Sequence, residues 1–80
     1  MTLEQQANEV AIVTAYIQSN NLLRGSFFQT IDLALKIAKE FVSHYEEQLP
    51  EWDSSKINLE FDEAIESFVK KNVPFYYLSP

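Results

Sequence analysis

The sequence predicts an all-α protein, an antiparallel three-helix bundle followed by an extended apolar tail. Apolar residues recur every three or four positions through most of the 80-residue chain, as one face of an α-helix requires. A single glycine is too few for a series of tight β-turns. The chain has no cysteine, so no disulfide can stabilise the fold and helix packing must do so. At this length we expect one helical domain, residues 1–80.

The first predicted helix covers residues 3–19. Thr2 and Gln5 have the spacing of a capping box, and Asn20 and Asn21 tolerate the left-handed conformation common at helix ends. Its expected core face is Leu3, Ala7, Val10, Val13 and Ile17.

The second predicted helix covers residues 27–48, because Ser26 and Gln29 repeat the capping-box spacing and Pro50 stops the helix. More than half of its circumference is apolar, which suits a central helix with two neighbours, or with one neighbour and a second subunit. Its main stripe is Phe28, Ile31, Leu35, Ala38, Val42 and Tyr45, and Phe27, Ala34 and Phe41 widen it.

Residues 49–56 are predicted to be a linker, in which Asp53, Ser54 or Ser55 could cap the next helix. That third helix is expected over residues 57–71, although its first residues could be extended. Its expected core face is Ile57, Phe61, Ala64, Ile65 and Phe68. The apolar tail, residues 73–80, is expected to lie as a strap over a groove between helices rather than to be captured by another subunit.

The net charge of −6 and the pI near 4.5 argue against direct binding to nucleic acid or to an anionic membrane. No apolar run approaches the roughly 20 residues that span a bilayer. The first residues are not basic and precede no compact apolar region, so we expect no secretory signal and a cytoplasmic location.

The acidic charge is concentrated in one part of the chain. Residues 46–66 carry a charge of −7, whereas residues 1–45 carry −1 and residues 67–80 carry +2. This segment is a candidate surface for a basic protein partner, and the alternative is a surface that serves solubility only. Trp52 within it is either an interface anchor or a lid on the end of the bundle. The candidate residues are Glu46, Glu47, Glu51, Trp52, Asp53, Glu60, Asp62, Glu63 and Glu66.

A second candidate surface consists of apolar residues that helical periodicity directs outward, together with the tail aromatics. They could contact a partner or a second copy, or the helix residues could pack against the tail. These residues are Ile12, Tyr16, Leu33, Ile37, Leu59, Phe75, Tyr76 and Tyr77.

The sequence offers little support for catalysis or for a metal site, and we expect no cofactor. His44 is the only histidine, and with Glu40 and Glu47 it is more typical of a surface charge network than of a metal site. No serine lies in a glycine-framed turn, and paired carboxylates need a pocket that separates their pKa values. We therefore expect a protein that is not an enzyme.

These observations favour a small acidic module that binds another protein. It would be an inhibitor or adaptor that presents its acidic side chains to a basic groove of a partner, such as a nucleic-acid-processing protein. By occupying that groove, the acidic side chains could mimic DNA or RNA. In size and charge alone, the chain resembles the small acidic proteins with which phages and mobile elements block host nucleic-acid enzymes. The alternative is a structural or self-assembling module whose apolar faces form a homodimer.

Overall fold

The computed structural model describes residues 1–54 and 59–80, with the backbone alone for Asp53 and Ser54. These residues are organised into four α-helices and one 3₁₀ turn, so the all-α class is confirmed. The elements are α1 (Leu3–Ser19), α2 (Phe27–His44), α3 (Leu49–Ser54), α4 (Leu59–Asn72) and the 3₁₀ turn η1 (Phe75–Tyr77).

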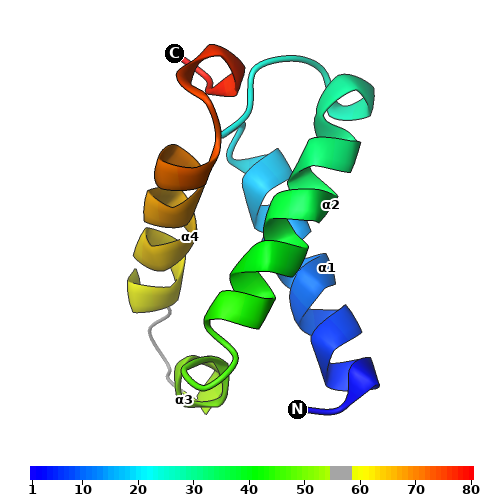
Figure 1. Ribbon diagram of the computed structural model, residues 1–80, viewed down its shortest axis with the longest axis vertical. Helices are drawn as coiled ribbons and strands as arrows, with labels where there is room; N and C mark the ends of the chain where they lie inside the picture. Colours follow the sequence, from blue (N-terminus) through cyan, green and yellow to red (C-terminus); the bar gives the residue numbers. More distant parts are fainter. Residues whose placement is uncertain (55–58) are drawn as a thin grey trace.

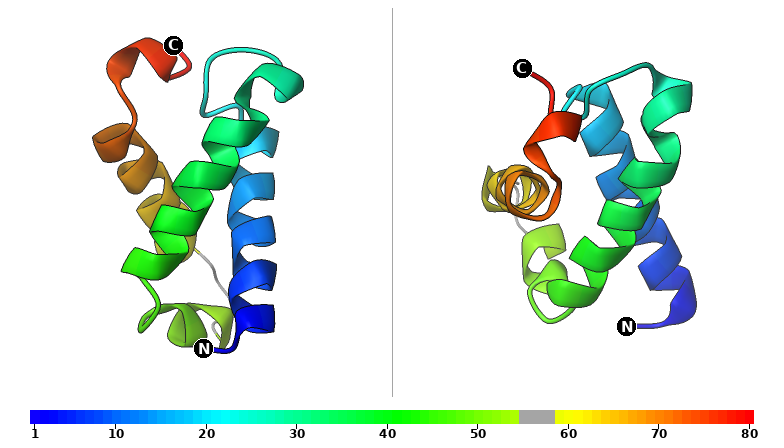
Figure 2. Two further views of the ribbon diagram at one scale, coloured as in Figure 1. Left: turned by 45° about the vertical axis from the view of Figure 1, so that its right-hand side comes forward. Right: turned by 45° about the horizontal axis from the view of Figure 1, so that its top comes forward.

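The central element is α2, which packs against both α1 and α4. In Figure 1, α1 runs upward, α2 returns downward across it, and α4 runs upward again. The short helix α3 lies below the lower end of α2, and η1 lies at the top (Figures 1 and 2). The molecule measures 33 × 24 × 19 Å, and its longest axis follows the long helices.

Both predicted capping boxes are present. The Thr2 hydroxyl accepts from the Gln5 N–H at 3.1 Å, and the Gln5 side chain accepts from the Thr2 N–H at 2.8 Å. Ser26 and Gln29 make the same reciprocal pair at the start of α2. These bonds satisfy N–H groups that a helix start leaves unpaired, which explains why both helix starts could be located from local sequence.

The predicted end of the second helix and the predicted linker are both wrong. Helix α2 ends at His44, and residues 49–54 form α3. Proline at the second position of α3 is compatible with a helix, because the first turn needs no intrahelical N–H. Leu49 is fully buried and anchors α3 to the core. The start predicted at residue 57 and the candidate cap Ser55 lie outside the described residues, as do the side chains of Asp53 and Ser54.

Phe41 is the centre of the core. Its ring is fully buried, and its centroid lies 4.7 Å from that of Tyr45, 5.5 Å from Phe68, 5.9 Å from Phe61 and 6.4 Å from Trp52. Three helices and the turn after α2 therefore meet around one aromatic side chain. The buried apolar residues are Val13, Ile17, Leu23, Ala34, Ile37, Ala38, Phe41, Val42, Leu49, Phe61, Ile65, Phe68, Val69 and Val73.

Several predicted core positions lie at the surface instead. Leu3 is 83% exposed, Phe28 is 87% exposed, and Ala7 and Phe27 are exposed as well. The reason is that α1 and α2 cross, so the start of each helix projects beyond its neighbour (Figure 1). The crossing also turns Ile37, which was predicted to face outward, into the core at 3% exposure.

The tail is neither fully extended nor a strap with buried rings. After the buried Val73, the chain turns into η1, and Leu78 then forms an isolated antiparallel bridge with Leu23. The Arg24 N–H donates to the Tyr77 carbonyl at 2.8 Å, and the Ser79 N–H donates to the Leu22 carbonyl at 3.1 Å. The backbone of the tail is thus fixed to the α1–α2 loop while its aromatic side chains stay exposed.

We expect Phe41→Ala to lower the free energy of unfolding by about 3–5 kcal/mol, since it opens a cavity where α2, α3 and α4 meet. A domain of this size obtains roughly that amount from its whole core, so the variant should lose its near-ultraviolet circular dichroism. Urea denaturation measures the change. Phe75→Ala, at a site that is 91% exposed, is the matched control and should change stability by less than about 0.5 kcal/mol. A loss below about 1 kcal/mol for Phe41→Ala would contradict the central role of this ring.

Candidate acidic surface

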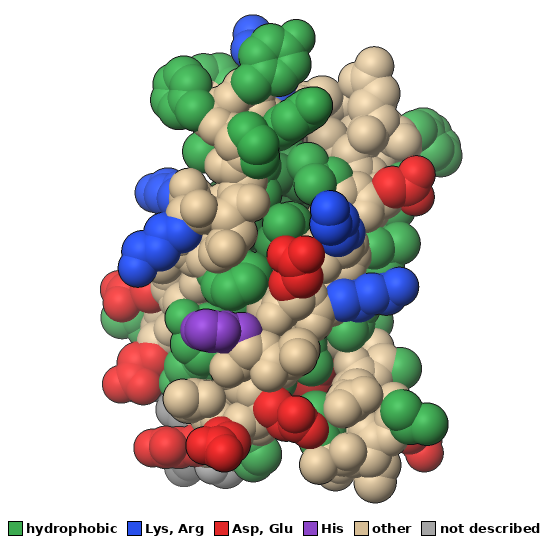
Figure 3. All heavy atoms as spheres, viewed as in Figure 1, with side chains coloured by type: hydrophobic (Ala, Val, Ile, Leu, Met, Phe, Trp, Pro, Cys, Tyr) green, Lys and Arg blue, Asp and Glu red, His purple; other side chains and the backbone are tan. Residues whose placement is uncertain are grey.

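The acidic residues of the candidate surface gather toward one end of the molecule. Glu46 and Glu47 lie in the turn after α2, Glu51 is in α3, and Glu60 and Glu63 are in the first half of α4. These elements meet at the lower end in Figure 1, and in Figure 3 most of the acidic side chains on the visible face lie in its lower half. We call these five residues the acidic end.

Helix polarity explains part of this charge arrangement. Glu60 and Asp62 lie in the first turn of α4, and Lys70 and Lys71 lie in its last turn. Each placement complements the helix dipole and typically contributes about 0.3–1 kcal/mol. Glu63 and Glu66 lie beyond the first turn, so the dipole alone does not account for their charges.

The carboxylates of the acidic end differ in their contacts. Among the described residues, the one salt bridge joins the Met1 amino group to Glu46 at 3.7 Å. The Gln6 side chain also donates to Glu46, at 3.5 Å. Glu47 and Glu63 are exposed and form no salt bridge within the described part of the chain. The charges of Glu47 and Glu63 are therefore exposed to solvent without a salt-bridge partner among the described residues.

Trp52 has the surroundings of a lid on the core. It is half-buried in α3, with its indole 5.4 Å from the Tyr45 ring and 5.8 Å from the Phe61 ring, centroid to centroid. Its Nε1–H donates to Glu60 at 3.3 Å, which joins α3 to the first turn of α4. This packing gives Trp52 a structural role beneath the acidic end.

A hydrogen bond between Tyr16 and Glu66 brings the two candidate surfaces together. The Tyr16 hydroxyl donates to Glu66 Oε1 at 3.1 Å. The charge of Asp62, one turn before Glu66 in α4, also acts on the Tyr16 hydroxyl, and Ile12 lies one turn before Tyr16 in α1. Leu59 lies one further turn back on the same side of α4 as Asp62.

This arrangement, which we call the α1–α4 face, places exposed apolar side chains among carboxylates. Ile12 is 49% exposed and Leu59 is 59% exposed. Helical spacing assigned these residues to two separate surfaces, and only the pairing of α1 with α4 combines them. The face consists of Ile12, Tyr16, Leu59, Asp62 and Glu66.

The other apolar candidates do not join this face. Ile37 is in the core, and Leu33 is half-buried and packs against it. Phe75, Tyr76 and Tyr77 lie at the opposite end of the molecule, on η1. The predicted apolar surface is therefore divided among three places.

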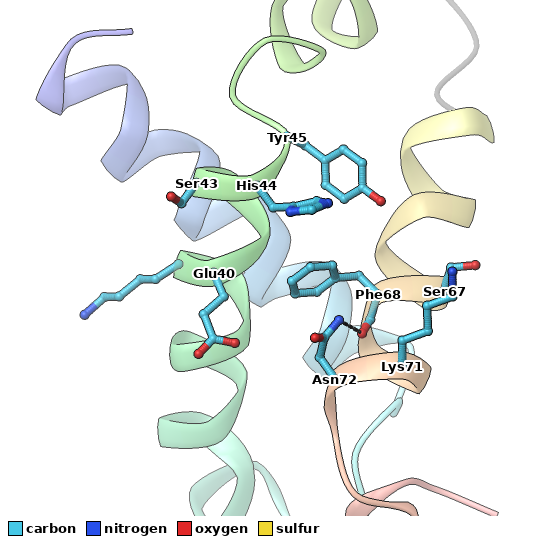
Figure 4. A pocket seen from close by; sticks show the side chains of 9 residues that line it. Glu40, Ser43, His44, Tyr45, Ser67, Phe68, Lys71 and Asn72 are labelled. Carbon is cyan, nitrogen blue, oxygen red and sulfur yellow. Dashed lines mark hydrogen bonds between the residues drawn. The ribbon is translucent and has the colours of Figure 1, made fainter.

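His44 borders a groove of about 690 Å³ between α2 and α4 (Figure 4). Its imidazole lies against the rings of Tyr45 and Phe68, with centroids 4.7 and 5.7 Å away. Lys39 and Lys71, distant in sequence, line the same groove together with Glu40. No group of three His, Asp or Glu side chains in the described chain is placed to hold a metal ion.

Comparison with known proteins adds no assignment. The chain matches no protein-family model, no curated protein and no solved structure. Among the described helices, none combines the length and the apolar character needed to cross a lipid bilayer.

Alkaline pH should weaken the contact between α1 and α4. Burial raises the pKa of Tyr16 from 10.0 to about 12, and the hydrogen bond and negative charge of Glu66 and the charge of Asp62 act in the same direction. The folded protein then retains a proton that the unfolded chain loses above pH 10. The stability that this retained proton provides is fully present below pH 10 and is lost as the pH rises through about 12. The free energy of unfolding therefore falls over that range.

Thermal melting as a function of pH measures this effect in the wild type and in Tyr16→Phe. The variant should lack this part of the alkaline decline, and Tyr76→Phe, which leaves the Tyr16–Glu66 bond intact, should retain it. Glu66→Gln keeps a hydrogen-bond acceptor but removes the charge, so tyrosinate absorbance should show Tyr16 ionising at a lower pH. An unchanged alkaline decline in Tyr16→Phe would contradict the assignment.

Proposed function

We propose that this protein binds another protein through its acidic end and the adjoining α1–α4 face. The observation that carries the proposal is the exposure of Ile12 and Leu59 on helices that also carry carboxylates, together with the exposed Glu47 and Glu63, which form no salt bridge within the described part of the chain. Helix α4 fixes the relative positions of Leu59 and its neighbouring glutamates, so the apolar and the charged side chains can contact the same partner surface.

The two kinds of side chain would serve different steps of binding. Carboxylates attract a basic surface over a distance and raise the association rate, an effect that added salt weakens. Ile12 and Leu59 would then be buried in the complex and slow its dissociation. Trp52, half-buried beneath the acidic end, would support this surface rather than anchor the partner.

The partner that fits this surface is a protein with a basic groove, such as a nucleic-acid-processing protein. Such a groove binds phosphates with Lys and Arg, and carboxylates on a rigid helix can occupy the same positions. The protein would then act as an inhibitor or adaptor without touching nucleic acid itself. The dimer through the broad face of α2 has little support, because Ile37 is buried and Leu33 packs against the core.

Reversal of two exposed charges tests this proposal. Glu47→Lys combined with Glu63→Lys changes the surface but removes no hydrogen bond or salt bridge of the described chain. The matched control, Asp32→Lys combined with Glu40→Lys, makes the same change in net charge at exposed positions of α2. We expect the first variant to slow association with a captured partner about 10-fold or more, and the control to have a much smaller effect.

The measurement is affinity capture from an extract of the source organism at low and high salt, followed by association kinetics with the purified partner. Protein retained by the wild type and the control, released by salt and lost from the Glu47/Glu63 variant would support the proposal. Equal retention by both variants at every salt concentration would contradict it. Leu59→Ser should speed dissociation with little change in the association rate.

A further inference from the structure

The end of the molecule opposite α3 exposes five aromatic side chains. They come from two segments distant in sequence, the first turn of α2 and the 3₁₀ turn η1, which both lie at the top in Figure 1. Phe28 and Phe75 are the most exposed, at 87% and 91%. We call this region the aromatic end, and it comprises Phe27, Phe28, Phe75, Tyr76 and Tyr77.

The aromatic side chains stand on an ordered backbone. The capping box of Ser26 fixes the start of α2, and the bonds between residues 22–24 and 77–79 fix η1. Phe27 and Phe28 form an edge-to-face pair with centroids 5.7 Å apart, and Tyr76 and Tyr77 form another at 5.4 Å. Binding at this end would therefore cost little ordering of the backbone.

The aromatic end lies in the part of the chain that lacks acidic side chains. Between residues 18 and 31 the one charged side chain is Arg24, and residues 73–80 contain none. The Arg24 guanidinium lies 6.0 Å from the centre of the Tyr76 ring. Asp32, one turn beyond Phe28, is the first acidic residue along α2.

This charge distribution favours self-association at one end only. Two copies that each carry −6 repel each other, and most strongly if their acidic ends meet. Contact through the aromatic ends places the acidic ends on opposite sides of the pair, separated by up to two lengths of a 33 Å molecule. At such distances salt screens the repulsion almost completely.

The exposed aromatic area is close to what a stable dimer requires. At about 200 Å² per aromatic side chain, the five exposed fractions correspond to roughly 700 Å² per copy. A standard protein interface buries about 800 Å² on each side, and aromatic residues are enriched in such interfaces.

We propose that the aromatic end binds the aromatic end of a second copy, which forms a symmetric homodimer. In such an interface the same patch serves both subunits, so aromatic side chains of α2 and η1 meet their counterparts across a two-fold axis. The dimer carries its two acidic ends outward. It would engage two partner molecules, or two sites on one partner, with higher avidity than a single copy.

Light scattering and sedimentation equilibrium of the full chain over a range of concentrations test this proposal. The wild type should reach the mass of a dimer, with a dissociation constant that added salt does not increase, because the interface is apolar. Phe28→Glu combined with Phe75→Glu should weaken the dimer at least about 30-fold, since it places like charges across the axis at anchor positions. Circular dichroism should stay unchanged, because both positions are exposed.

Two controls locate the interface. Leu3→Glu introduces the same charge at an 83% exposed apolar position remote from the aromatic end, and Leu59→Glu introduces it on the α1–α4 face. Both variants should remain dimeric, and so should the Glu47/Glu63 variant. The dimer proposal and the proposal of a partner-binding surface are therefore tested separately. Dissociation caused by Leu59→Glu would place the interface on the α1–α4 face and overturn the proposal.

Two further outcomes would also overturn it. One is a wild type that stays monomeric at about 100 μM, well above the dissociation constants typical of specific dimers. The other is a monomer that co-sediments with phosphatidylcholine vesicles while the Phe28/Phe75 variant does not, which would assign the aromatic end to a lipid surface.

Discussion

The rest of the structure depends on the burial of the Phe41 ring. The chain has no disulfide, and this ring is the point at which α2, α3 and α4 meet. Trp52 and Phe61 contribute the aromatic surfaces that close over it. The short helix α3 could not persist alone in water at six residues, and packing against this cluster stabilises it.

The position of this cluster also distinguishes the two ends of the molecule. Near α3, aromatic side chains turn inward and carboxylates cover the outside, with the bond from Trp52 to Glu60 joining the two layers. At the other end the first turn of α2 projects beyond the end of α1, and Phe27 and Phe28 remain exposed. One end therefore presents charge on a rigid support, and the other presents aromatic rings on an ordered turn.

The proposed functions follow from this division. A charged surface suits encounter with a basic partner, and an uncharged aromatic surface suits association with an identical copy that is otherwise repelled. The bond between Tyr16 and Glu66 bears on the proposed partner surface, because it joins α1, which carries the exposed Ile12, to α4, which carries the exposed Leu59. Ile12 and Leu59 come from two different helices, so the tertiary structure is needed to combine them.

Local sequence was enough to predict the helical class, both capping boxes, the first helix from Leu3 to Ser19 and the concentration of acidic residues after position 45. Each of these depends on neighbours within about one helical turn. The tertiary structure decided which faces are buried: it exposed Leu3 and Phe28, buried Ile37, and made residues 49–54 a helix. Periodicity shows which side chains share a face of one helix. It does not show the angle at which two helices cross, and that angle determines where each face gains or loses its neighbour.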